Sequence, residues 1–215
     1  MGLSVSEKGS KTYLSIINGK LAQKVPAGTP NAVSRENKNK QIINELLYDT
    51  LDGVITGLRM KDSDFGRELV VEIQSGIDKF TLNIPMESKY FDTFCYKINS
   101  VNLNNEVKIA PYSFDPNDGK GKKTGINFYQ NGVKLLHYYS PEDPKGKPFP
   151  DGKELSDSKW KIYKLQERDW LADMIVELSK KMGGAQETPQ QPLSIKDLRA
   201  KSNQAEPQQS SDLPF

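Results

Sequence analysis

Apolar and polar residues alternate along the middle of the chain with the period of two that is typical of half-buried β-strands. The alternation runs from residue 53 to residue 84, is interrupted by turn sequences at 61–66 and 75–76, and ends at Pro85. This pattern predicts three antiparallel strands in a meander. We expect the first of them to be one long bent strand over residues 41–60.

The spacing of the apolar residues changes after Pro85. Between residues 88 and 98 the apolar side chains recur every three or four positions, which predicts a short helix. Cys95 lies on the apolar stripe of this helix, where it is expected to be a small core residue. Polar residues such as Lys89, Asp92 and Lys97 lie away from the stripe.

Further strand and helix patterns lie on both sides of this central region. They predict a hairpin at 12–25 around Asn18 and Gly19, a strand at 106–114, a hairpin at 126–130 and 133–139, an irregular segment at 140–158, and an amphipathic helix at 165–182.

The central elements follow one another as three strands, a helix, a strand and a hairpin. This order resembles the oligonucleotide/oligosaccharide-binding (OB) fold, a five-stranded Greek-key barrel with its helix between the third and fourth strands. The expected fold class is therefore mainly β, an OB-fold barrel with an N-terminal hairpin and a C-terminal helix. We expect this domain to span residues 1–182, followed by a disordered polar tail at 183–215 that is rich in Gln, Pro, Ser and Ala.

The composition limits where a binding surface can arise. The 215 residues carry a net charge of +2, and residues 1–182 hold 27 of the 30 basic and 24 of the 28 acidic side chains, a net charge of +3. A positive groove must therefore come from local placement of lysines. One cysteine excludes an internal disulfide framework, and no apolar run is long enough to span a membrane. We expect a cytoplasmic protein without membrane contact, in a host cytoplasm if it is viral.

Basic and aromatic residues are interleaved in the second half of the predicted barrel. In such barrels the bases of a single strand stack on aromatic rings while nearby lysines hold the phosphates. Each residue taken alone could instead be a core aromatic or a solubilising lysine, and alternation allows at most one of Phe128 and Tyr129 to be core. The candidate DNA-binding residues in this region are Lys108, Tyr112, Phe114, Lys120, Lys122, Lys123 and Tyr129.

A second basic patch surrounds the first turn of the meander. Phe65 lies in this polar turn, where it would either cap a DNA groove or fold back beneath its own loop. The patch adds four candidate DNA contacts, Arg59, Lys61, Phe65 and Arg67.

The same region holds the densest group of carboxylates, so a metal-dependent nuclease is an alternative. The group consists of Asp62, Asp64, Glu68 and Glu72. Magnesium sites need carboxylates that converge from separate elements, whereas two of these share one turn and two lie on a strand face directed to solvent. The single histidine, His137, has no zinc-site spacing around it and is expected to be a half-buried sheet residue. We therefore expect no catalytic residue, metal or cofactor.

The last four residues, Asp212, Leu213, Pro214 and Phe215, combine two apolar side chains, a stiff proline and two anionic groups. Such a tip suits a small hydrophobic pocket rimmed by Arg or Lys. It resembles the tip of bacterial single-stranded DNA-binding proteins, in which an acidic run closes on Asp-(Ile/Leu)-Pro-Phe and recruits replication and repair proteins. This chain has two serines where that family usually has further Asp. The alternative is an ordinary frayed terminus.

Together these features predict a non-enzymatic protein that covers single-stranded DNA and recruits replication, recombination and repair proteins through its tip. The resemblance to the family implies a divergent member of the kind that bacteriophages carry. The rival hypothesis is a replisome-associated protein that docks through a mimic tail without binding DNA itself. The sequence leaves the preference between DNA and RNA open, and also the oligomeric state, a homo-oligomer included.

Overall fold

The computed structural model describes residues 11–37, 39–64, 66–117, 119, 121–150 and 156–183. The chain divides into one unit over Met1–Gly184 and a second over Ala185–Phe215, and every described residue belongs to the first. The tip at 212–215 therefore lies outside the described residues, as do Phe65 and Lys120.

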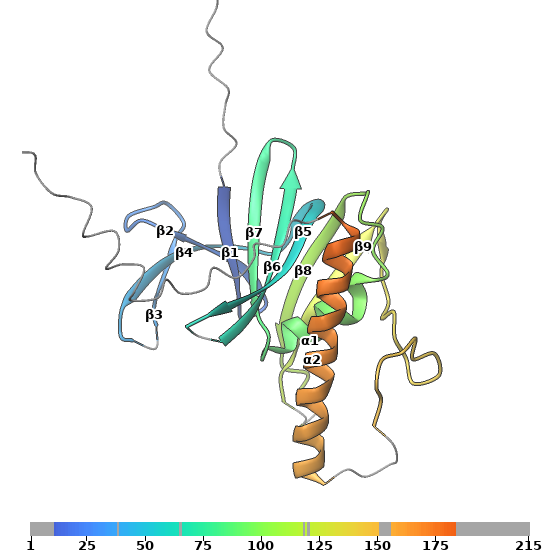
Figure 1. Cartoon of the computed structure of the whole chain (residues 1–215). Coiled ribbons are helices and arrows are strands. Elements are labelled where there is room, and N and C mark those ends of the chain that lie inside the picture. The colour runs from blue at the N-terminus through green and yellow to red at the C-terminus, as the bar shows by residue number, and fades with distance from the viewer. Residues whose placement is uncertain are drawn as a thin grey trace, which may run out of the picture. The chain divides into compact units, whose positions relative to one another are not determined.

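The described part of the chain forms ten strands and two helices (Figure 1). In chain order they are β1 (Lys11–Ile17), β2 (Lys20–Val25), β3 (Val33–Glu36), β4 (Ile42–Tyr48), β5 (Leu51–Ser63), β6 (Gly66–Ser75), β7 (Asp78–Pro85), α1 (Lys89–Ile98), β8 (Val107–Phe114), β9 (Lys123–Gln130), β10 (Val133–Lys134) and α2 (Asp157–Lys181).

All the strands belong to one open sheet in the order β10-β9-β8-β5-β6-β7-β1-β2-β4-β3. Neighbouring strands are antiparallel except for β1 and β7, which run parallel. The expected mainly β fold, the meander β5–β7, the N-terminal hairpin β1–β2 and the C-terminal helix α2 are all present. Asn18 and Gly19 have positive φ angles, as the predicted hairpin turn requires.

The prediction of a closed five-stranded barrel is wrong, because the two edges that closure would join have other partners. The outer edge of β7 is paired with β1, from Lys11 opposite Lys79 onward. The outer edge of β9 is paired with β10 at its end, and further along it is covered by side chains of α1. The Ile126 N–H donates to Thr93 Oγ1 at 2.9 Å, and Lys97 Nζ donates to the Ile126 carbonyl at 2.7 Å. With both edges occupied, the sheet stays open.

Three predicted boundaries also need correction. The bent strand over 41–60 is two strands, since the chain turns at residues 49–50 and β4 joins the outer strands β2 and β3. The strand at 133–139 ends at Lys134, after which the Tyr138 N–H donates to the Tyr96 carbonyl of α1 at 2.7 Å. Helix α2 begins at Asp157, eight residues before the predicted start.

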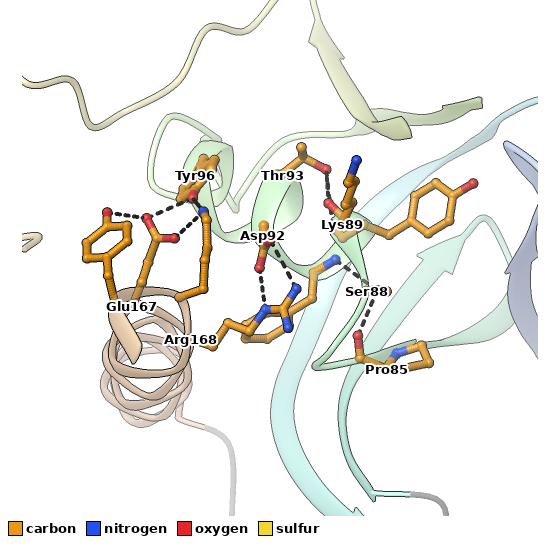
Figure 2. Close-up of polar contacts among 12 residues, drawn as sticks. Pro85, Ser88, Lys89, Asp92, Thr93, Tyr96, Glu167 and Arg168 are labelled. Atoms are coloured by element: carbon orange, nitrogen blue, oxygen red, sulfur yellow. Dashed lines mark hydrogen bonds and ion pairs between the residues drawn. The ribbon is translucent and has the colours of Figure 1, made fainter. Parts of the chain in front are cut away.

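Helix α1 supplies much of the core. The predicted stripe of Phe91, Phe94, Cys95 and Ile98 is fully buried, and the Phe94 ring meets that of Phe128 edge-on at 5.1 Å. Asp92 and Lys97 lie off this stripe, but both are buried. Arg168 of α2 donates to Asp92 at 3.0 Å (Figure 2). None of the described helices is long and apolar enough to cross a membrane.

Candidate nucleic-acid interface

The pairing of β8 with β9 sorts their side chains onto two faces. Val107 and Ile109 of β8 and Ile126 and Phe128 of β9 point into the core and are buried. Tyr129 lies on the opposite face, so Phe128 is the core residue of that pair, in keeping with the alternation rule. Residues paired across the two strands share this outer face: Phe114 with Lys123, Tyr112 with Gly125, and Lys108 with Tyr129.

A groove with a volume of about 550 Å³ lies over one end of this face. The residues that line it combine aromatic rings and lysines and include no carboxylate. They are Lys89, Tyr112, Phe114, Lys122, Lys123, Thr124, Asn127 and Lys134. We call this feature the β8–β9 groove. Four lysines beside two rings give it a locally positive surface, although the chain as a whole carries little net charge.

The two rings of the groove form a small platform. Tyr112 and Phe114 have their centroids 6.0 Å apart at an interplanar angle of 40°, and Phe114 is 52% exposed. The Tyr112 ring lies close over Gly125, where a Cβ would come within 2.7 Å of Tyr112 Oη. Glycine at this position therefore lets the tyrosine lie against β9 and keep its outer side available.

Helix α1 holds β9 in place from the other side. Ser88 caps the helix by accepting from the Phe91 N–H at 3.2 Å, and Lys89 and Thr93 follow on the first turns (Figure 2). Lys97 Nζ also donates to Asn127 Oδ1 at 3.3 Å, which orients that amide in the groove. Burial, and then the charge of Lys134, lower the pKa of Lys97 from its ordinary value.

The turn between β1 and β2 supports the groove from beneath. The Gly19 N–H donates to Tyr90 Oη at 2.8 Å. A Cβ on Gly19 would lie 2.3 Å from the Ser113 nitrogen and 2.6 Å from the Tyr112 carbonyl carbon, so only glycine permits this approach. The N-terminal hairpin thus contacts the backbone that carries Tyr112.

The sequence-predicted site residues fall into four groups, of which the second basic patch is described separately below. Tyr112, Phe114, Lys122 and Lys123 line the groove together. Lys108 and Tyr129 lie on the same face of the strands but outside the groove lining, and Lys108 Nζ is 3.6 Å from Asp52. Lys120, Phe65 and the tip Asp212, Leu213, Pro214 and Phe215 lie outside the described residues.

The second basic patch does not reach the groove. Arg59, Lys61 and Arg67 lie on the β5–β6 hairpin, and β5 touches β8 only over Leu51–Gly53. At about 3.3 Å per residue, Arg59 is about 20 Å along the strand from that contact. Arg67 instead approaches Asp62 at 3.9 Å. Among the described residues, no group of three His, Cys, Asp or Glu side chains could hold a metal ion.

Sequence reasoning missed half of the groove lining. The missed residues are Thr124 and Asn127 of β9 itself, and Lys89 and Lys134, which join the lining because α1 and β10 flank β9. Thr124 and Asn127 could have been found from the sequence, since they lie in or next to the predicted strand that follows the basic loop. Lys134 could be located through the predicted hairpin, which pairs it with β9, whereas Lys89 could not, because only the tertiary arrangement brings it near Tyr112.

Comparison with known proteins found no matching family model, curated protein or solved structure.

Proposed function

We propose that the chain binds single-stranded DNA without sequence preference, and that the β8–β9 groove is where it does so. The observation that carries this proposal is the convergence of Tyr112 and Phe114 with four lysines in one groove. Rings offer a stacking surface to any base, at about 1–3 kcal/mol per base, and ammonium groups bind phosphates whatever the sequence. The groove thus combines the two elements of non-specific strand binding.

The same features favour single strands over duplexes. Stacking on Phe114 requires an unpaired base, since the bases of a duplex already stack on one another. Duplex affinity comes mainly from phosphate contacts, and the net charge of +3 on residues 1–182 offers little general attraction for them. We therefore expect binding to single strands to persist at salt concentrations that abolish binding to duplexes.

The proposal extends to the biological setting. The Asp212–Phe215 tip, which resembles that of the bacterial single-stranded DNA-binding proteins, would recruit replication, recombination and repair proteins to the covered strand. The protein would act in the cytoplasm, a host cytoplasm if it is viral, by stoichiometric coverage and not by catalysis. This part of the proposal is supported by sequence resemblance alone.

A titration with fluorescently labelled oligo(dT), followed by anisotropy, tests the groove directly. Phe114→Ala removes an exposed ring and should weaken binding about 5- to 150-fold, the equivalent of one stacked base at 1–3 kcal/mol. The matched control is Tyr13→Ala, which removes an exposed ring next to Lys11 on β1 (61% exposed, against 52% for Phe114). Unchanged affinity in Phe114→Ala, or equal affinity of the parent protein for duplex and single strand, would refute the proposal.

The rival hypothesis, docking without DNA binding, is decided in the same titration. It expects no anisotropy change with the parent protein at any salt concentration. A variant that combines Lys122→Gln with Lys123→Gln adds a second readout. For each lysine that binds a phosphate in the parent complex, the substitution should lower the slope of log affinity against log salt by about 0.7.

A further inference from the structure

A second cavity, of about 370 Å³, lies at the other end of α1 between that helix, the 137–150 segment and the first half of α2. Its walls are mainly aromatic and include Tyr96, Phe149, Trp160 and Tyr163. We call it the α2 pocket. Nothing in the function proposed for the β8–β9 groove accounts for this many rings around an open cavity.

The α2 pocket carries a net positive charge. Glu167, only 1% exposed, accepts from Lys147 Nζ and Lys164 Nζ at 2.5 Å each. It also accepts from Tyr96 Oη at 2.8 Å (Figure 2). A fourth hydrogen bond comes from Tyr163 Oη at 2.9 Å. Both carboxylate oxygens are thus engaged, and one carboxylate faces two ammonium groups. The excess charge favours an anionic ligand.

Trp160 gives the pocket an exposed stacking surface. Its side chain is 46% exposed, and its ring lies 5.3 Å from that of Tyr163 at an interplanar angle of 32°. Lys164 Nζ is 5.6 Å from the centre of the Trp160 ring and remains partly exposed. An exposed ring with an ammonium group beside it matches the base and phosphate of one nucleotide.

The α2 pocket and the β8–β9 groove are separate cavities that are both lined by residues of helix α1. Lys89 lines the groove and Tyr96 lines the pocket, seven residues apart on the same helix. At a rise of 1.5 Å per residue they are about 10 Å apart along the helix axis, a distance that a strand with stacked bases, at about 3.4 Å per nucleotide, covers in about three nucleotides. On the other side the chain passes from Lys134 in the groove to His137 in the pocket within three residues.

We propose that the α2 pocket is a second base-stacking subsite for the same single strand, with Trp160 as the stacking ring and Lys164 as a phosphate contact. This inference rests on the proposed function of the β8–β9 groove. A strand that fills the groove and continues along α1 reaches the pocket after about three further nucleotides. Short oligonucleotides then occupy the groove alone, and longer ones occupy both subsites.

Intrinsic tryptophan fluorescence tests this subsite, because the chain has only two tryptophans and they differ in exposure. Trp160 is exposed in the pocket, whereas Trp170 is partly buried with its ring 5.4 Å from that of Tyr139. Oligo(dT) of about 4 nucleotides is long enough for the two rings of the groove alone, whereas oligo(dT) of about 15 nucleotides is long enough to reach the pocket as well. The longer oligonucleotide should quench the fluorescence strongly and the shorter one little.

Two matched variants show which tryptophan is responsible for the quenching. Trp160→Phe keeps a ring in place and should abolish the quenching, whereas Trp170→Phe should retain it. Trp160→Ala should weaken binding of the longer oligonucleotide about 5- to 150-fold and leave the shorter one unchanged. Circular dichroism establishes that each variant is folded.

The outcomes separate this inference from the proposal on which it rests. If Phe114→Ala weakens binding but Trp160→Ala changes neither length, the second subsite is refuted and the groove stands. If no oligonucleotide binds the parent protein, both proposals fail. Quenching of Trp160 by a proline- and aromatic-rich acidic peptide, with none by oligo(dT), also overturns the subsite in favour of a peptide-binding pocket.

Discussion

Replacing Glu167 by Gln should destabilise the protein more than any surface substitution on α2. The side chain is buried, and its carboxylate accepts from two lysines and two tyrosines. Gln keeps the size of the side chain but loses the charge and one acceptor oxygen. Lys147, whose side chain is only 3% exposed, would then be left as a buried cation without a counter-charge.

The magnitude follows from the pKa of Glu167. Burial alone would raise this pKa, but the hydrogen bonds from the four partners outweigh it and lower the pKa from 4.5 to about 2. At 1.36 kcal/mol per pKa unit, the charged form contributes about 3 kcal/mol to the free energy of unfolding at pH 7. Because the folded pKa is the lower one, this contribution is complete above about pH 5, falls to about half near pH 3, and is lost below pH 2.

Urea denaturation followed by tryptophan fluorescence measures the effect, since both tryptophans lie on α2. At pH 7 the Gln variant should unfold with a free energy about 3 kcal/mol lower than that of the parent, and the difference should narrow as the pH falls from 5 to 3. Glu177→Gln is the control, because its ion pair with Lys180 is exposed and should contribute nothing measurable. A Glu167→Gln variant as stable as the control, or a difference that does not change with pH, would refute the reasoning.

Two further predictions concern the groove and the tip. Gly125→Ala should weaken oligo(dT) binding, because the new Cβ displaces the Tyr112 ring. The loss should be at most that of one stacked base, about 1–3 kcal/mol. An unchanged affinity in the anisotropy titration would contradict this prediction. Phe215→Ala should abolish the capture of proteins that bind an Asp-Leu-Pro-Phe tip, since truncating an aromatic anchor commonly costs about 2 kcal/mol or more. The affinity for oligo(dT) should stay unchanged. A pull-down in which the variant retains the same partners would contradict this prediction.

Local periodicity predicted the elements of the fold far better than their pairing. The alternation over β5–β7 and the helical stripe of α1 follow from which side chains must be buried, so they could be located without a structure. Whether the strands close into a barrel could not be predicted, because that depends on which elements pair with the outer edges of β7 and β9. The parallel pairing of β1 with β7 joins residues almost 70 positions apart, and no local pattern encodes it.

Polar residues with distant partners account for the other errors. Periodicity does not predict the burial of Lys97, because it lies off the apolar stripe, but the Ile126 carbonyl, 29 residues away, accepts its hydrogen bond. The first turns of α2 lack an apolar stripe, and Lys164 there donates a hydrogen bond to Tyr96 Oη, 68 residues away in sequence. A polar side chain can be buried at low cost only when a hydrogen-bond partner is present. The spacing of apolar residues carries no information about such distant partners.

The candidate site was half predictable for the same reason. Tyr112 and Phe114 stand on the outer face by strand alternation, and Lys122 and Lys123 follow from the loop that joins β8 to β9. Lys89 and the whole α2 pocket depend on how α1 packs against β9 and α2, so the sequence could not place them.

The open sheet predicts that no smaller five-stranded binding module can be cut out of this chain. Removing residues 1–25 deletes β1 and β2, and with them Leu14 and Leu21 from the core, which should cost about 1.5–3 kcal/mol for each leucine. It also exposes the edge of β7 and removes the packing of Gly19 against the backbone of Tyr112. Against a total stability of about 5–15 kcal/mol, these changes should leave a largely unfolded protein without oligo(dT) affinity.

Thermal unfolding by circular dichroism measures the loss of stability, and an anisotropy titration measures the loss of oligo(dT) affinity. Removal of residues 184–215 is the control that should change neither. A shortened protein that melts cooperatively and still binds oligo(dT) would show that the strands close on themselves without the hairpin, contrary to the pairing described above.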